Sequence, residues 1–235
     1  MTETARPRIA ILGRIAEATS VTRHAGLVTA LRLAQAVWQA GGEPITLLPV
    51  ANADWQTRLK GIDGVLLPGG GDLNPETYGQ KPATDQIYGV VDLQDQTDIS
   101  LFNYAIEQGL PLLAICRGHQ VVNVAMHGDL VQDMDQPHRH HVHQVRVDQP
   151  HLLGLAATQP DGSATVTASC YHHQAVEHLA PALKAIAQSI DGVVEATVIS
   201  EKVWQRTVQW HPEDNFDTHP ENLQIFEAFV NACRA

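Results

Sequence analysis

The stretch LPLLAICRGHQVVNVAMHG, residues 110–128, decides the fold because it joins a buried strand to a helix at a cysteine. The run PLLAIC is apolar throughout, which is typical of a strand covered on both faces. An apolar helical pattern begins at Arg117. So sharp a turn lifts its central side chain, Cys116, out of the sheet and requires small residues beside it. Ala114 and Gly118, two residues before and two after, meet that requirement.

The chain around this corner alternates apolar runs with helical patterns. We expect buried strands at residues 8–13, 43–50, 64–71 and 111–116, and helices at residues 26–40, 92–108 and from residue 117. This alternation indicates a parallel sheet with helices on both faces. In the first helix, the residues expected on the buried stripe are Leu27, Ala30, Leu31, Ala34 and Trp38.

The second half of the chain has a different character, with short strand-like segments and few helices between them. These segments are residues 142–147, 163–169, 183–190, 193–198 and 202–210, and a closing helix follows at residues 222–233. They predict partly antiparallel strands added to one side of the sheet. Because the sequence shows no repeat, low-complexity segment or linker, we expect one domain over residues 1–235.

The composition limits the classes of protein that the chain can belong to. A net charge of −11, with only 15 Lys and Arg in 235 residues, argues against nucleic-acid binding, which requires a basic face. No apolar run is long enough to span a membrane. The start MTETARPRIAILG lacks the pattern of a secretory signal, and three scattered cysteines do not form a disulfide framework. We therefore expect a cytoplasmic protein with neither nucleic-acid nor membrane partners.

The position of Cys116 favours a reactive thiolate. The free N–H groups and the positive dipole end of the following helix stabilise a negative sulfur. The alternative is a cysteine packed as a small apolar side chain, which is the commoner fate of cysteine in general.

Two further motifs could complete a nucleophile's site. In VQWHPEDN, residues 208–215, a strand carries His211 to its end, and Glu213 can reach the imidazole across the bend that Pro212 starts. In LLPGGGDLNPE, residues 66–76, a glycine turn offers bare backbone N–H groups for an oxyanion. Taken alone, a His and a Glu at this spacing are more often part of an ordinary surface loop, and a glycine turn is often no more than a turn.

Taken together and in order, the motifs resemble the class I glutamine amidotransferases. More narrowly, they resemble the stand-alone branch of gamma-glutamyl-gamma-aminobutyrate hydrolase-like peptidases. The resemblance runs from Ile9 to the C-terminus and implies a flavodoxin-like α/β fold. It is carried by PGGGDLNP (68–75), ICRGHQVVNVA (115–125), GDLVQD (128–133), SCYHHQAV (169–176), DGVVEA (191–196) and VQWHPE (208–213).

The resemblance implies a role for each matched residue. Cys116 would be the nucleophile, His211 the general base and acid, and Glu213 the carboxylate that orients the imidazole. The remaining implied roles fall on Gly70 and the Arg117 amide as oxyanion donors, and on Gln120, Tyr171 and His172 as residues that bind the substrate. The implied reaction is hydrolysis of a gamma-glutamyl amide of a small molecule through a glutamyl thioester, with no cofactor. Whether the protein forms a homodimer is left open.

Some positions depart from the family pattern. Ala114 stands where glycine is usual, Gln94-Asp95 replaces Arg-Asp, Asp98 replaces Glu, and His127-Gly128-Asp129 replaces a Gly-Gly-Thr turn. The implied triad is untouched by these changes. The amine half of the substrate would meet a variable rim, for which the sequence offers Asp72, Asn74, Glu76 and Gln86.

The histidine-rich stretch PHRHHVHQV, residues 137–145, raises the question of a metal site. His141 and His143 would share one face of a strand, but no nearby cysteine supplies a further ligand. We expect solvated histidines in a polar loop, and no metal.

Three functions compete at this point. The first is a cysteine hydrolase of gamma-glutamyl amides. The second is a glutaminase subunit that delivers ammonia to a separate synthase. The third is a non-enzymatic relative whose cysteine senses redox state, and His211 with Glu213 argues against it, because a sensor cysteine needs no base with an orienting carboxylate.

Overall fold

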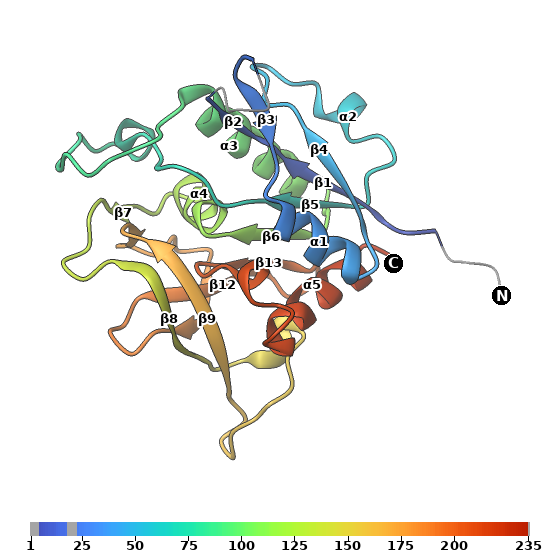
Figure 1. Ribbon diagram of the computed structural model, residues 1–235, viewed down its shortest axis with the longest axis vertical. Helices are drawn as coiled ribbons and strands as arrows, with labels where there is room; N and C mark the ends of the chain where they lie inside the picture. Colours follow the sequence, from blue (N-terminus) through green and yellow to red (C-terminus); the bar gives the residue numbers. More distant parts are fainter. Residues whose placement is uncertain (1–4, 18–22, 235) are drawn as a thin grey trace.

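The computed structural model describes residues 5–17 and 23–234, and a nine-stranded sheet runs through its centre (Figure 1). The strands lie in the order β4-β1-β5-β6-β13-β12-β11-β8-β9. Their bounds in chain order are β1 Arg8–Leu12, β4 Glu43–Leu47, β5 Gly64–Leu67, β6 Leu112–Ile115, β8 His138–Val147, β9 Ala164–His172, β11 Lys184–Gln188, β12 Val194–Ser200 and β13 Gln205–Val208. Two small antiparallel pairs accompany this sheet: β2 Arg14–Ala16 with β3 Gly26–Val28, and β7 Leu130–Val131 with β10 Ala175–Val176.

The strand directions divide the sheet into two parts. Neighbours from β4 through β1, β5 and β6 to β13 are parallel. Neighbours from β13 through β12, β11 and β8 to β9 are antiparallel. The predicted flavodoxin-like α/β fold, with antiparallel strands added from the C-terminal half, is therefore confirmed.

Helices cover both faces of the parallel part. The helices are α1 Leu31–Gln39, α2 Trp55–Arg58, α3 Asp92–Glu107, α4 Arg117–Ala125 and α5 Pro220–Ala232, and the 3-10 turns are η1 Pro75–Tyr78, η2 Pro150–Leu153 and η3 Pro212–Asp214. None of the helices in the described residues is both long and apolar enough to cross a membrane.

Alternating side chains of each buried strand belong to two separate apolar cores, because successive residues of a strand point to opposite faces. On β1, Ile9 and Ile11 pack with α1 and α5, whereas Ala10 and Leu12 pack with α3 and α4. The same alternation continues through β5 and β6. Because the side chains of each strand point alternately to the two faces, both faces are apolar and each is covered by helices, as the sequence predicts.

The antiparallel part of the sheet bends back toward the parallel part. Although β9 is the edge strand, the N–H of His211, just after β13, donates to the Ser169 carbonyl of β9 at 2.7 Å. Inward residues of β8 and β9, such as Val145 and Ala168, join the same core as Trp210. This bend places the end of β9 beside the loop that follows β13.

The predicted buried stripe of the first helix is wrong. The chain forms β3 before the helix, so α1 begins only at Leu31, and its buried face is Leu33, Ala36 and Val37. Leu31 is 72% exposed and Trp38 51% exposed. The apolar spacing counted from residue 27 therefore included strand residues, and this shifted the helical phase.

Candidate active site

Cys116 occupies the corner between β6 and α4 in a conformation that few residues adopt. Its φ is 52° and its ψ is −107°, and its N–H donates to the Val208 carbonyl at 2.8 Å. A non-glycine residue in such a region costs on the order of 1–3 kcal/mol and persists where the surroundings enforce it. Its side chain is almost fully buried. The structure thus places Cys116 at the strand-to-helix corner that the sequence predicts.

Gly118 makes this corner possible. A Cβ at this position would lie 2.3 Å from the carbonyl oxygen of Leu67, which is backbone and cannot move aside as a side chain could. Only glycine allows the first turn of α4 to pack this closely against β5. The requirement for a small residue after the cysteine is therefore steric.

His211 and Glu213 form a pair at the end of β13. His211 Nδ1 lies 2.8 Å from a Glu213 carboxylate oxygen, and the carboxylate is buried. Cys116 and the same imidazole both lie against Gly69. Burial alone would lower the pKa of His211, but the charges of Cys116 and Glu213 outweigh it and raise this pKa well above its ordinary value. The surroundings of the imidazole therefore favour its charged form.

The glycine turn after β5 closes over these two side chains. A Cβ on Gly69 would lie 2.8 Å from His211 Cε1 and 3.7 Å from Cys116 Cβ, so the bare backbone is what lets the turn approach. Gly70 follows directly and lies against the side chains of Arg14 and Arg117. Arg117 is the first residue of α4, so its N–H has no partner within the helix.

A buried ion-pair network fixes this turn to the corner. The Arg117 guanidinium, itself buried, pairs with Asp95 and Asp98 of α3. Arg14 pairs with Asp98 at 2.9 Å, and its Nε donates to the Gly69 carbonyl at 2.7 Å. Burial raises the pKa of Asp95, although Arg117 pulls it down. The anions of this network are therefore Asp95, which the family pattern shares, and Asp98, which stands where the pattern has Glu.

Arg14 is the site residue that sequence reasoning missed. It follows the buried strand RIAILG directly, at the carboxyl end where the sheet's other functional residues gather. A charged residue at that point is the available signal. Its partners Gly69 and Asp98 lie more than 50 residues away in the sequence, so no local pattern predicts them.

A cavity of about 500 Å³ opens beside the imidazole. Gly69, Tyr171, His211 and Glu213 line it together with Arg14 and the segment 28–33 that leads into α1. Leu31, expected in the core, lines this cavity instead.

Of the three residues expected to bind the substrate, Tyr171 alone contributes to the lining of this cavity. Gln120 is buried, and its amide nitrogen donates to the Gln174 carbonyl at 3.1 Å and to Gln209 at 3.2 Å. His172 is buried too, and it faces a different cluster of side chains. Neither side chain therefore lines this cavity.

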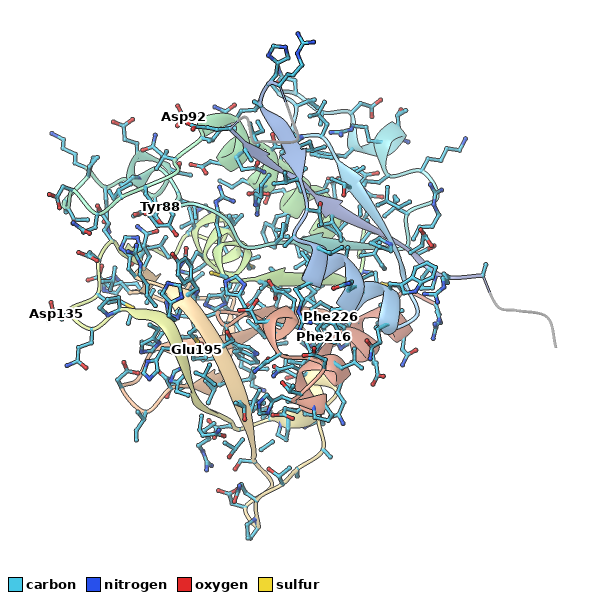
Figure 2. All side chains as sticks on the ribbon, in the orientation of Figure 1. Tyr88, Asp92, Asp135, Glu195, Phe216 and Phe226 are labelled. Carbon is cyan, nitrogen blue, oxygen red and sulfur yellow. The ribbon has the colours of Figure 1, made fainter. Side chains whose placement is uncertain are left out.

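Asp72 does not lie on the exposed rim where the sequence analysis put it. It is buried, and its carboxylate accepts from the Tyr88 N–H at 3.0 Å and lies 2.9 Å from His173 Nε2. Figure 2 labels Tyr88 on the segment before α3, and the Asp72 N–H, just after the glycine turn, donates to the Tyr88 carbonyl at 2.9 Å. Asn74 is also engaged, because it accepts from the Glu76 N–H at the start of η1. Gln86 is exposed, as expected for a residue on the rim.

The fold and the motifs together are those of the class I glutamine amidotransferase-like proteins. The chain belongs to the peptidase C26 family, whose model matches residues 7–213.

Two relatives and one solved structure illustrate the similarity. Protein NtpR of Enterococcus hirae is 35% identical over 211 residues, which cover 83% of this chain and 85% of NtpR. Gamma-glutamyl-gamma-aminobutyrate hydrolase PuuD of Escherichia coli is 31% identical over 234 residues, which cover 90% of this chain and 88% of PuuD. PurLQS from Thermotoga maritima has a TM-score of 0.65 at 13% identity, with 96% of this chain and 98% of that chain covered, a likeness of fold alone. The family and the hydrolase among its relatives make this chain an enzyme.

The charge on His211 can be tested directly by NMR. We expect the imidazole of His211 to titrate well above pH 6.5 in the wild-type protein. The Cys116→Ala variant should lower this pKa, because burial still opposes the charge while one attracting partner is gone. Titration of the ring resonances from pH 5 to 10 measures both values, and Cys233→Ala is the control with another buried cysteine removed. An unchanged pKa in Cys116→Ala contradicts the described contact.

The ion-pair network should contribute strongly to stability. Asp98→Asn leaves Arg14 and Arg117 without a shared anion, and breaking a buried pair in this way costs about 3–5 kcal/mol of unfolding free energy. Asp217→Asn, which breaks an exposed pair with Arg32, is the matched control and should change it little. Urea denaturation at neutral pH measures both. Similar small losses in the two variants would show that the network does not hold the turn.

Proposed function

We propose that the protein is a cysteine hydrolase that cleaves gamma-glutamyl amide bonds of small amines, gamma-glutamyl-gamma-aminobutyrate among them. The observation that carries this proposal is the position of His211, whose Nδ1 lies 2.8 Å from a Glu213 carboxylate oxygen and whose ring lies against Gly69 together with Cys116. Similarity to PuuD, a protein named for this hydrolysis, points to the substrate class.

In the first half of the proposed reaction, the Cys116 sulfur forms a bond with the gamma-carbonyl carbon. The carbonyl oxygen becomes an oxyanion, for which the N–H groups of Gly70 and Arg117 are the donors. The C–N bond then breaks, and the protonated His211 gives its proton to the departing amine. A glutamyl thioester on Cys116 remains.

In the second half, His211 is neutral and takes a proton from a water molecule that attacks the thioester. The new tetrahedral centre collapses, the C–S bond breaks, and glutamate leaves while the thiolate and imidazolium are restored. Glu213 accepts a hydrogen bond from Nδ1 throughout, which fixes the ring and stabilises its charged form.

For the substrate, the cavity beside His211 is the proposed binding place, with Tyr171 on its wall. Tyr171 is exposed, so its ring is free to contact the ligand. Gln120 and His172, which the family resemblance also implies, act in this proposal by supporting the segment 169–174 from behind.

A second Cys-His-Glu set, Cys170, His172 and Glu195, lies nearby and could be mistaken for the catalytic one. Burial raises the pKa of the Cys170 thiol far above its ordinary value, which opposes thiolate formation. Cys170 also lies within β9 and not at a helix start. For these reasons the proposal assigns the nucleophile to Cys116.

The proposed activity is tested by incubating the purified protein alone with gamma-glutamyl-gamma-aminobutyrate or with glutamine and measuring released glutamate. We expect steady turnover of the first substrate without any added protein. Turnover of glutamine that appears only with a synthase partner would instead support the alternative, a glutaminase subunit. No glutamate from either substrate would contradict both.

The proposed roles predict a graded series of variants. Cys116→Ala should abolish glutamate release, and Cys170→Ala, its matched control, should retain most of it. Glu213→Gln should slow kcat less than His211→Ala, because an amide still orients the ring whereas nothing replaces the proton carrier. The measurement is kcat and KM for each variant. Equal, small losses across the four would remove these assignments.

A further inference from the structure

A second cluster of reactive side chains lies behind the candidate active site, where three strands of the antiparallel part meet. His138 comes from β8, Cys170 and His172 come from β9, and Glu195 comes from β12. All four side chains are buried, and one N, S or O atom of each lies within 4.8 Å of the others. Figure 2 labels Glu195 in the region that β8 and β9 overlie in this view.

The atoms that face one another in this cluster have no hydrogen-bond partners among the described residues. They are both carboxylate oxygens of Glu195, Nδ1 of His138 and Nε2 of His172. The nearest approach to Glu195 is His138 Nδ1 at 3.5 Å. Buried polar atoms are nearly always paired, so four unpartnered atoms within one cluster indicate that a ligand binds between them.

The other nitrogen of each imidazole is already held. His172 Nδ1 lies 2.9 Å from the Gln174 carbonyl, and His138 Nε2 lies 2.9 Å from an Asp191 carboxylate oxygen. A backbone carbonyl on one ring and a carboxylate on the other are the supports that metal-binding histidines usually have. Each support leaves the second ring nitrogen without a partner.

The donor set of the cluster matches a divalent cation. Its four side chains are two imidazoles, one thiol and one carboxylate. When the thiol releases its proton on metal binding, the thiolate and the carboxylate carry two negative charges, which one divalent cation balances.

We propose that His138, Cys170, His172 and Glu195 form a zinc site that ties the β8–β9 hairpin to β12. Two imidazoles, a thiolate and a carboxylate are the ligand types zinc takes, and four protein ligands leave no open position for catalysis. The site is thus structural and independent of the proposed hydrolysis. His143 lies beside it, with Nε2 3.2 Å from the Cys170 sulfur.

This proposal replaces part of the expectation from the sequence. His140 and His141 are exposed, as expected for a polar loop, but His138 is buried. An irregularity in the β8–β9 register between Arg139 and His141 separates the inward His138 from its exposed neighbours. The cysteine that seemed absent near the stretch comes from β9, opposite His141 in the ladder.

Metal content and cobalt spectroscopy test the site without reference to activity. Untagged wild-type protein should carry about one zinc ion per chain by elemental analysis. After removal with a chelator, Co²⁺ should restore a tetrahedral visible spectrum and a thiolate-to-cobalt absorption in the near ultraviolet. Protein that takes up neither Zn²⁺ nor Co²⁺ overturns the proposal.

Variants identify the ligands. Cys170→Ala and Glu195→Gln should weaken Zn²⁺ binding by at least about 10-fold, the loss seen even for outer supports of metal ligands, and Cys170→Ala should abolish the thiolate absorption. Cys233→Ala and His151→Gln are the matched controls, a buried cysteine and an exposed histidine outside the cluster, and should bind normally. If Cys170→Ala fails to fold, the Co²⁺ spectrum of Cys116→Ala takes its place. A retained thiolate absorption supports the site, and its loss would show that Cys116, not Cys170, binds the metal, which overturns the proposal. Unchanged affinity in Cys170→Ala also overturns the site.

Discussion

The buried pairing of Arg117 with Asp95 and Asp98 is the interaction on which the candidate active site depends. Removing these charges from water is costly, and the cost is offset only when each charge meets a well-placed partner. Arg14 completes the set by joining Asp98 to the Gly69 carbonyl. The network thereby connects the ends of β1, β5 and α3 with the start of α4, and it fixes the glycine turn above Cys116. A site built from three separate loops becomes one rigid unit.

The other half of the site depends on the bend in the antiparallel sheet. The loop after β13 would end in solvent if β8 and β9 continued the plane of the parallel strands. Instead, the hydrogen bond from the His211 N–H to the Ser169 carbonyl closes β9 against this loop. The same bend brings Cys170 and His172 of β9 toward Glu195 of β12. One feature of the fold thus shapes both the imidazole's position and the neighbouring cluster.

Much of this architecture could be predicted from the sequence, because its signals are local. Apolar runs, glycine turns and the small residues around Cys116 each report on a few adjacent positions. The burial of Asp72 and the role of Arg14 could not be predicted, because each depends on a partner distant in the chain. The prediction of the buried face of α1 was wrong for another reason. The strand Gly26–Val28 precedes the helix, and its apolar residues were counted as part of the helical pattern. Likewise, the cluster around Glu195 could not be predicted, because its residues come from three strands that only the folded sheet brings together.

The two cysteines near the site show how the same side chain acquires opposite chemistry. Cys116 lies at a helix start, at the corner between β6 and α4 and beside the His211 imidazole. Cys170 lies within β9, between Ala168 and His172 on the buried face of the strand, and burial raises the pKa of its thiol. Its neighbours are the histidines and the carboxylate of the second cluster. The fold therefore gives the proposed nucleophile and the proposed metal ligand different surroundings.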